Sequence, residues 1–478
     1  MSNLSDLLPA GAGGKQVSFV ASGTIGNGVT VGLNSDGTVT AVAGVSQATG
    51  SPVVFESANT FYCSCAFDSS NNKVVISYVD LANSEYGTAV VGTVSGTNIS
   101  FGTPVVFESS AIAYTSTVFD INSNKTVTTY RASSTGRSIV GTVSGTSISF
   151  GSFSYLSTNN VRNFTSTFDS ANNKVVVAYT DQSASNYGKT KVGTVSGTSI
   201  SYGTEVTYNS ARSEFSSLTF DSSNNKIVLS FTDHGNSEYG TSIVGTVSGT
   251  SISFGSKTAF ESAVTEVISS AFDSSANKVV IAYQDRGNSN YGTGVVGTVS
   301  GTSISFGTPV VFNAAQTNDI AIAFDNSSNK CTIAYQDVGN SNYGTLVVGS
   351  VSGNSISFGS ELVFENASAD EIAITFDSNA NKIVIAYQDE GNLGYGTSVV
   401  FQNASSNSTD FIGISDAAIS DTASGSVTIK GGISTNVTGL TPNSTYYVQT
   451  DGSLSTTASD VLAGKALSST SINLDYTS

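Results

Sequence analysis

The chain has 478 residues, of which 11% are charged, and its formal net charge is −17. With only 18 Lys and Arg, nucleic acid is not an expected partner, because phosphate neutralisation needs clustered basic residues. No apolar run approaches the roughly eighteen residues of a membrane span, and the N-terminus lacks the basic start and long apolar core of a secretory signal, so we expect neither membrane insertion nor secretion.

Residues 1–45 precede the repeats and predict part of a small β domain. V-S-F-V-A-S-G-T (Val17–Thr24) and V-T-V-G-L (Val29–Leu33) form an expected hairpin, which leads into an N-S-D-G turn at Asn34–Gly37.

From residue 46 to residue 401 one phrase recurs seven times. Its anchor is the turn F-D-x-x-x-N-K, which ends at Lys73, Lys125, Lys174, Lys226, Lys278, Lys330 and Lys382. The intervals are 52, 49, 52, 52, 52 and 52 residues. A period of about 40 to 50 residues with only strand and turn signals is typical of a β-propeller or a β-solenoid. The count of seven favours a closed propeller.

One unit, residues 267–312, shows four strands. Apolar and polar residues alternate or form short Val/Ile blocks, with no helical spacing. The expected strands are A (Val267–Asp273), B (Lys278–Asp285), C (Gly292–Val299) and D (Ser303–Phe312). Tight turns between A and B and between C and D predict antiparallel hairpins. The longer D-to-A stretch is the expected connection to the next blade.

The last unit has strands A, B and C but no D, whereas an additional D-like strand, Ser51–Ser57, stands before the first A. A solenoid would have no reason to keep a half-unit at its opposite end. We therefore predict a seven-bladed propeller of four-stranded blades, closed by pairing of Ser51–Ser57 with Thr397–Phe401, because closure leaves no open sheet edge at the seam.

Residues 402–478 contain expected strands around Ser426–Lys430, Thr445–Thr450 and Ser469–Leu474, separated by G-G, T-P-N and T-D-G-S turns. Closure would bring both flanks beside the same blade. The predicted organisation is therefore a split β domain (1–45 and 402–478) into which the propeller (46–401) is inserted.

In such a blade the B–C and D–A connections share one face, and here these segments differ between units. Because loops carry binding while a scaffold stays fixed, this variable face is the predicted binding face. The B–C loop of the second unit, R-A-S-S-T-G-R, is three residues shorter and contributes Arg131 and Arg137.

The other B–C loops repeat an Asp and a Tyr, as in Y-Q-D-R-G-N-S-N-Y-G. The candidate ligand-binding residues are Asp80, Tyr86, Arg131, Arg137, Asp181, Tyr187, Asp233, Tyr239, Asp285, Tyr291, Asp337, Tyr343, Asp389 and Tyr395. Carboxylates, amides and an aromatic ring suit a saccharide. The structural alternative is that Asp caps its own turn and Tyr packs between blades. Repetition in nearly every unit favours that alternative, because a specific site seldom recurs.

Metal, cofactor and catalytic signals are poor. No loop has the acidic spacing of an EF-hand, and the single histidine, His234, excludes a Cys/His zinc cluster. A glycosidase needs paired carboxylates, which Asp370 and Glu371 could supply, but five Arg and no Trp argue against a sialidase-type propeller. We expect no cofactor, no metal and no enzymatic activity. Cys63, Cys65 and Cys331 are expected to be buried free thiols.

The flanks resemble modules of virion structural proteins from marine, cyanophage-type bacteriophages. The resemblance lies in L-S-D-L-L-P-A-G-A-G-G-K, F-V-A-S-G-T-I-G-N-G-V-T-V-G-L-N-S-D-G-T-V, F-I-G-I-S-D-A-A-I-S-D-T-A-S-G and G-L-T-P-N-S-T-Y-Y-V-Q-T-D-G-S-L-S-T-T, about a quarter of the chain. It implies a tail-fibre-like or head-decoration protein, located on the virion, with other virion proteins as partners.

The expected function is a non-catalytic adhesin that binds a host surface glycan or receptor through the propeller. A purely architectural capsid-decoration or fibre subunit is the alternative, and a glycan depolymerase is the third choice. The sequence leaves a homo-oligomer open.

Overall fold

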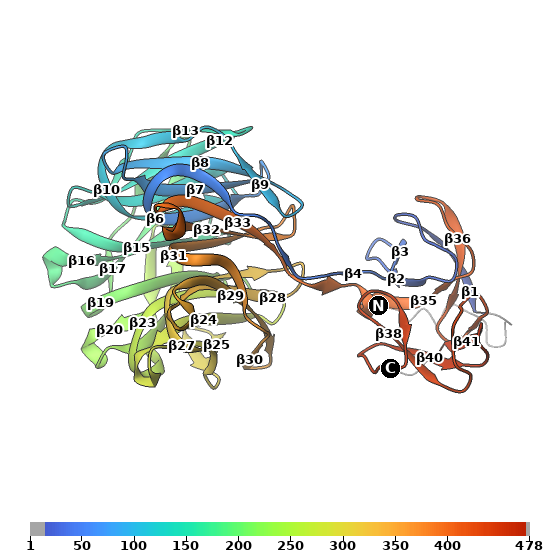
Figure 1. Cartoon of the computed structure of the whole chain (residues 1–478). Helices are drawn as coiled ribbons and strands as arrows, with labels where there is room; N and C mark the ends of the chain where they lie inside the picture. Colours follow the sequence, from blue (N-terminus) through green and yellow to red (C-terminus); the bar gives the residue numbers. More distant parts are fainter. Residues whose placement is uncertain (1–14, 475–478) are drawn as a thin grey trace. The chain divides into compact units, whose positions relative to one another are not determined.

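The computed structural model describes residues 15–474, which form strands, turns and short 3-10 turns and no α-helix (Figure 1). The predicted all-β class is confirmed. No helix among these residues is long and apolar enough to cross a membrane. Most of the opening phrase that contributes to the phage resemblance, residues 4–14, lies outside the described part of the chain.

The chain divides into two compact units. Residues 48–403 form one, which we call the repeat region. Residues up to 47 and from 404 onward form the other, the flank unit. The sequence placed these divisions at 45/46 and 401/402.

Each repeat contributes two regular strands that correspond to the predicted B and C. The B strands are buried on both faces, as expected from their continuous Val/Ile runs. The B strands are β7 (Lys73–Asp80), β11 (Lys125–Ala132), β16 (Lys174–Asp181), β20 (Lys226–Asp233), β24 (Lys278–Asp285), β28 (Lys330–Asp337) and β32 (Lys382–Asp389). The C strands are β8 (Tyr86–Ser95), β12 (Thr135–Ser144), β17 (Tyr187–Ser196), β21 (Tyr239–Ser248), β25 (Tyr291–Ser300), β29 (Tyr343–Ser352) and β33 (Tyr395–Gln402). We number the repeats 1 to 7 by their B strands.

The predicted D strand is interrupted. Its first part is a short strand paired with C, and these strands are β9 (Asn98–Phe101), β13 (Ser147–Phe150), β18 (Ser199–Tyr202), β22 (Ser251–Phe254), β26 (Ser303–Phe306) and β30 (Ser355–Phe358). Its second part continues directly into the next A strand.

The expected D–A loops are therefore wrong for most repeats. Six 16-residue strands run through them: β6 (Val53–Asp68), β10 (Val105–Asp120), β19 (Val206–Asp221), β23 (Thr258–Asp273), β27 (Val310–Asp325) and β31 (Leu362–Asp377). The first half of each pairs with a C strand and the second half with the next B strand, so the backbone keeps hydrogen-bond partners almost throughout. Only before repeat 3 is the strand divided, into β14 (Ser154–Ser157) and β15 (Val161–Asp169).

A β-bulge bends each A strand, and one of its residues takes the left-handed backbone conformation. These residues are Tyr62, Tyr114, Asn163, Phe215, Val267, Asp319 and Glu371, with φ between 47° and 56°. Such values are unfavourable for bulky and β-branched residues, so the surrounding pairing must enforce them.

The predicted pairing of the N-terminal strand with the last repeat is confirmed. Val53 and Val54 are the partners of Ser398 and Thr397 on β33, and β5 (Ala48–Thr49) extends this contact to Phe401. The strand β6 also lies beside both β10 and β31. The hydrophobic cores lie between successive repeats, where for example Phe55 packs against Tyr78 and Phe101.

The flank unit consists mainly of two five-stranded antiparallel sheets. The first, in the order β1-β36-β35-β2-β3, joins strands from both ends of the chain. The expected direct hairpin between Val17–Thr24 and Val29–Leu33 is wrong, because β35 and β36 lie between β1 and β2. The turn at Asn34–Gly37 does connect paired strands, β2 and β3.

The strands of the first sheet are β1 (Gln16–Val20), β2 (Thr30–Leu33), β3 (Val39–Ala41), β35 (Phe411–Ser415) and β36 (Ser424–Ile429). Those of the second are β37 (Ile433–Ser434), β38 (Thr445–Val448), β39 (Leu454–Ser455), β40 (Leu462–Ala466) and β41 (Ile472–Leu474), and β4 (Gly44–Val45) pairs separately with β34 (Ser405–Ser406).

Candidate binding face

In six of the seven repeats the predicted Asp ends the B strand and the predicted Tyr begins the C strand. The two are direct cross-strand partners. The pairs are Asp80–Tyr86, Asp181–Tyr187, Asp233–Tyr239, Asp285–Tyr291, Asp337–Tyr343 and Asp389–Tyr395. The structure thus brings the members of each pair together, but each pair belongs to a different repeat.

Most of these aspartates close their own B–C turn. Asp181 accepts the backbone N–H of Ser183 at 2.9 Å, Asp233 accepts that of Gly235 at 3.0 Å, and Asp285 accepts that of Asn288 at 3.1 Å. All six aspartates are buried, whereas the six tyrosines are half-buried. The 3-10 turns that follow are η2 (Gln182–Ala184), η3 (His234–Asn236), η4 (Arg286–Asn288), η5 (Val338–Asn340) and η6 (Glu390–Asn392). The structural alternative therefore describes the Asp positions better than a ligand site does.

A second repeated contact was missed by sequence reasoning. In four of these six repeats the buried tyrosine two residues before the aspartate donates its hydroxyl to a glutamate, whereas repeat 4 has Phe231 at this position. Tyr78 donates to Glu56 at 2.9 Å and Tyr283 to Glu261 at 3.0 Å. Burial, followed by the neighbouring Asp80 carboxylate, raises the pKa of Glu56. The available signal was the glutamate 22 residues before the tyrosine.

The glutamate comes from one of two positions, 22 residues before the tyrosine or 26 residues after it. Repeats 1 and 5 use the first position, with Pro104 and Pro309 at the second. Repeat 3 uses the second, where Tyr179 donates to Glu205, and has Ser157 at the first. The alternation indicates that each of these sites accommodates a single glutamate.

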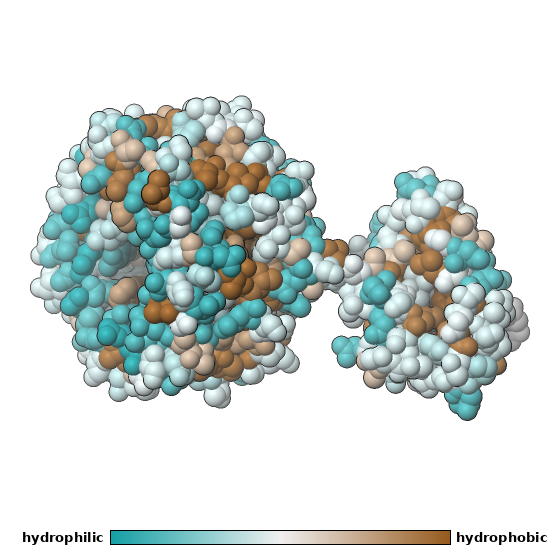
Figure 2. All heavy atoms as spheres, viewed as in Figure 1, coloured by the Kyte–Doolittle hydropathy of each residue, from teal (hydrophilic) through white to brown (hydrophobic). Residues whose placement is uncertain are grey.

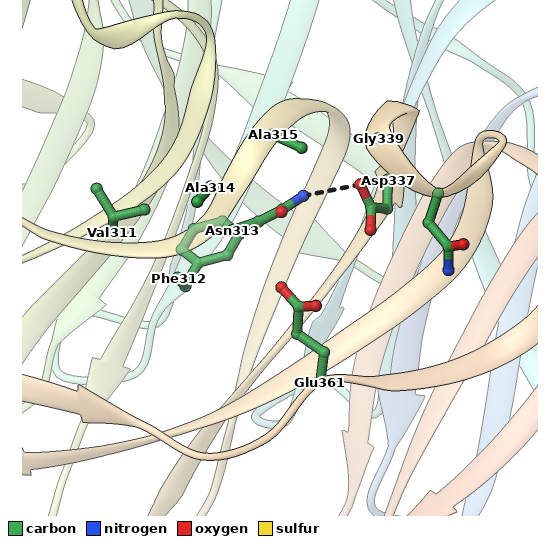
Figure 3. Close-up of a pocket in the computed structure, with 9 residues that line it drawn as sticks. Val311, Phe312, Asn313, Ala314, Ala315, Asp337, Gly339 and Glu361 are labelled. Atoms are coloured by element: carbon green, nitrogen blue, oxygen red, sulfur yellow. Dashed lines mark hydrogen bonds between the residues drawn. The ribbon is translucent and has the colours of Figure 1, made fainter.

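In repeat 6 the same location is an open pocket of about 530 Å³ (Figure 3). Asn313 donates its side-chain N–H to Asp337 at 3.1 Å, and Glu361 points toward them from the other side. Part of the lining consists of the small residues Ala314, Ala315 and Gly339, which leave the pocket open. Two carboxylates and an amide around such a space can accept and donate hydrogen bonds to the hydroxyls of a small polar ligand.

The two predicted arginines of repeat 2 lie in different surroundings. Arg131 donates from Nε to the carbonyl of Ser133 at 2.9 Å, and its guanidinium carbon lies 5.9 Å from the ring centroid of Tyr114. Arg137 forms an ion pair with Glu108 at 2.7 Å, and its guanidinium carbon lies 4.3 Å from the ring centroid of Phe153. Among the seven repeats, repeat 2 is thus the only one in which an arginine pairs with the glutamate that accepts from the buried tyrosine.

The two carboxylates considered for glycoside hydrolysis lie at the bulge of repeat 7. Glu371 accepts the backbone N–H of Tyr62 at 2.9 Å, and Asp319 accepts that of Glu371. Burial, followed by the nearby Asp370 carboxylate, raises the pKa of Asp319 to about 6. Burial, followed by Asp319, raises the pKa of Glu371 to about 7. Glu371 and Asp319 therefore each accept a hydrogen bond from the left-handed bulge residue of the following repeat.

His234 lies between two glutamates, with Nε2 3.1 Å from Glu214 and Nδ1 3.1 Å from Glu238. No group of three or more His, Cys, Asp or Glu within residues 15–474 could hold a metal ion. The three cysteines are free, as predicted; only Cys331 is fully buried, whereas Cys63 and Cys65 are partly buried.

No protein-family model and no curated protein matches this sequence. Among solved structures, the BP39L lectin from Burkholderia pseudomallei is 11% identical, with a TM-score of 0.54 over 74% of this chain and 98% of that chain. Sqt1 from Chaetomium thermophilum is also 11% identical, with a TM-score of 0.47 over 74% of this chain and 97% of that chain. At such identity the likeness to the lectin concerns the fold alone. Together with the strand pairing, it identifies the repeat region as an all-β, β-propeller-like fold.

Proposed function

We propose that the repeat region is a seven-bladed propeller, closed by β6, that acts as a non-catalytic adhesin for a host surface glycan. Closure is supported by the pairing of β33 with β6 and by the position of β6 beside β31. The adhesin would be a phage virion protein held to other virion proteins through the flank unit, as the sequence resemblance of the flanks implies.

The observation that carries the binding function is the pocket of repeat 6. Its lining combines Asp337, Glu361 and Asn313 with small residues, and it lies on the face predicted from the variable B–C segments. Carboxylates and an amide suit the hydroxyls of a saccharide. The lectin with a similar fold adds support at the level of the scaffold only.

We propose no catalysis on this face. The carboxylates with the clearest upward pKa shifts, Asp319 and Glu371, accept backbone N–H groups of the following repeat. A general acid or nucleophile must be available to its substrate, whereas these groups hold the bulges.

A separate observation supports the architectural alternative. The Asp turn caps and the Tyr–Glu hydrogen bonds are internal contacts, and the charged residues of the variable face are largely paired with each other. A decoration or fibre subunit would need only such internal contacts.

The test is binding of the labelled full chain to marine bacterial cells, with purified cell-surface polysaccharide as competitor. Saturable binding that the polysaccharide displaces is the expected result. Absence of binding across hosts that the corresponding phage infects, together with incorporation of the protein into particles, would favour the architectural alternative. Release of oligosaccharides from the polysaccharide would contradict the non-catalytic assignment.

A further inference from the structure

Repeat 2 keeps the buried tyrosine and its glutamate, Tyr130 and Glu108, but differs from the other repeats in the residues around them. The Asp–Tyr pair of the other six repeats is replaced by Ala132 and Thr135, which are cross-strand partners here. The B–C loop is also three residues shorter. Since this loop lacks both the turn-capping carboxylate and the packed ring, the scaffold contact that recurs elsewhere has been lost at this one place.

The lost groups are replaced by a cation and two aromatic rings. Arg137 stands where five repeats have threonine and one has lysine: Thr88, Lys189, Thr241, Thr293, Thr345 and Thr397. Its cross-strand partner Tyr155 stands where the others have Val, Thr or Ala. Phe153 stands where they have Pro, Glu or Lys.

The new side chains form one cluster. The guanidinium carbon of Arg137 lies 4.3 Å from the centroid of Phe153 and 5.7 Å from that of Tyr155. The two rings meet edge to face at 5.4 Å. Phe153 is 40% and Tyr155 52% exposed. Two large rings fixed against a guanidinium and left open to solvent form a stacking platform.

Hydrogen bonds hold the polar part of the cluster in place. Glu108 accepts from Arg137 at 2.7 Å, from the Tyr130 hydroxyl at 3.2 Å and from the Ser110 hydroxyl at 2.9 Å. Among the described residues, Arg137 donates from Nη1 to Glu108 and from Nε to the Thr135 hydroxyl, and Nη2 has no protein acceptor. The Arg137 and Glu108 side chains are only 17% and 11% exposed. The geometry is therefore set before any ligand arrives.

The ligand class follows from this chemistry. An exposed ring stacks on the apolar face of a pyranose, while a guanidinium donor and a carboxylate acceptor can bind neighbouring hydroxyls. The Glu108 carboxylate already balances the Arg137 charge, so the site offers an anionic sugar little net attraction. We infer that Arg137, Glu108, Phe153 and Tyr155 form a specific binding site for a neutral pyranose ring with vicinal hydroxyls.

This inference rests on the proposed adhesin function and names the site that provides its specificity. It also explains the contrast between the repeats. The Asp–Tyr pair recurs because it belongs to the scaffold, whereas a site specific for one ligand occurs only once. The pocket of repeat 6 is lined differently, by carboxylates without an exposed aromatic ring. On the face of the repeat region seen in Figure 2, hydrophobic residues are interspersed among hydrophilic ones.

The test is saturation-transfer NMR of the full chain with the methyl pyranosides of glucose, galactose, mannose, fucose and glucuronic acid. At least one neutral glycoside should receive saturation. Tyr155→Val, which installs a residue that other repeats carry at this position, should weaken its binding about tenfold, as loss of a stacking ring implies. Arg137→Thr should do the same. Val54→Ala, at the equivalent exposed position on β6, is the control and should bind as the unmodified chain does.

Three results would overturn the inference: no neutral glycoside receives saturation, the glucuronide binds more tightly than the neutral sugars, or Tyr155→Val binds normally. Retention on immobilised bacterial polysaccharide distinguishes failure of the repeat 2 site from failure of the adhesin function. If the unmodified chain and Tyr155→Val are retained equally, the adhesin stands and this site is wrong. If the unmodified chain is not retained, both are wrong.

Discussion

Repeats 2 and 7 share a buried tyrosine that donates to a glutamate, Tyr130 to Glu108 at 3.2 Å and Tyr387 to Glu365 at 2.8 Å. The charged group beside this glutamate differs: it is an aspartate in repeat 7 and an arginine in repeat 2. In repeat 7, burial, with the nearby Asp389 carboxylate adding to it, raises the pKa of Glu365. In repeat 2, Ala132 replaces that aspartate and Arg137 neutralises the glutamate.

The contrast shows that the strands do not depend on the residues of the variable face. Repeat 2 lacks the Asp–Tyr pair yet keeps its B and C strands in the same register as the others. The buried B strands maintain the scaffold, so the residues at the end of a repeat can differ without loss of its strands. We expect variants in repeat 7 to alter stability and variants in repeat 2 to alter binding.

The largest expected effect is on the strand that completes repeat 7. Phe55 is buried against Tyr78 and Phe101. Phe55→Ala should lower the free energy of unfolding by about 3–5 kcal/mol, through lost burial and the cavity left behind. Chemical denaturation measures this, with exposed Val54→Ala as the matched control. An effect no larger than that of Val54→Ala would contradict the proposed closure by β6.

The next largest effect is expected when alanine replaces a glycine that has the same position in repeats 7 and 2. A Cβ at Gly396 would lie 2.4 Å from Phe55, whereas a Cβ at Gly136 would come no closer than 3.0 Å to Val161. Gly396→Ala should cost about 1–3 kcal/mol of stability through overpacking, and Gly136→Ala less. Thermal unfolding of the two variants measures whether Gly396→Ala loses more stability than Gly136→Ala. Equal losses would show that repeat 2 is packed as tightly as repeat 7.

The acidic bulge of repeat 7 predicts a pH dependence. Glu371, with a pKa of about 7, and Asp319, with a pKa of about 6, bind protons more tightly when folded than their ordinary values near 4 imply. Their stabilising contribution is complete below pH 4 and is lost as the pH rises through 7. Asp370, the Tyr62 backbone N–H, the Tyr62 phenol and the Cys63 thiol also interact with this pair of carboxylates.

Denaturation of the unmodified chain at pH 8 and pH 6 should therefore show a gain on acidification on the order of 1 kcal/mol, because both side chains retain some solvent exposure. Glu371→Gln can still accept the Tyr62 N–H, and should remove much of this gain. The exposed Glu390→Gln is the control. An unchanged pH slope in Glu371→Gln would assign the dependence to other carboxylates.

The smallest stability effect is expected in repeat 2. Arg137→Thr recreates the arrangement of repeat 7, where Glu365 accepts from a tyrosine beside Thr397 without a cation. The free energy of unfolding should change by less than about 1 kcal/mol. A larger loss in chemical denaturation would make Arg137 a structural residue and would weaken its assignment to binding.

Much of the scaffold was predictable from the sequence, since strand periodicity and the F-D-x-x-x-N-K turns repeat. The pairing of Val53 and Val54 with β33 followed from an unmatched D strand. The polar D–A segments were misread as loops, because composition does not reveal that both halves are hydrogen-bonded. Nor could a left-handed Val267 be foreseen, since pairing imposes it against its own preference.

The candidate site was predictable only in part. Arg137 was found because the shortened loop marks repeat 2, whereas the Asp–Tyr pairs proved to be cross-strand pairs of the scaffold. Phe153 and Tyr155 were missed, although alignment of the repeats shows aromatic rings where the others have Pro, Glu, Lys, Val, Thr or Ala. Their contact with Arg137 depends on the register of β12 with β14, which only the structure gives.

The most direct test restores the other repeats' residues at the cluster, as the combined variant Arg137→Thr, Phe153→Pro and Tyr155→Val. Its binding to bacterial surface polysaccharide is measured beside the unmodified full chain, with thermal unfolding to verify the fold. We predict an unchanged fold and loss of most polysaccharide binding. Full retention of binding by the folded variant would contradict the repeat 2 cluster as the site that provides the specificity of the adhesin.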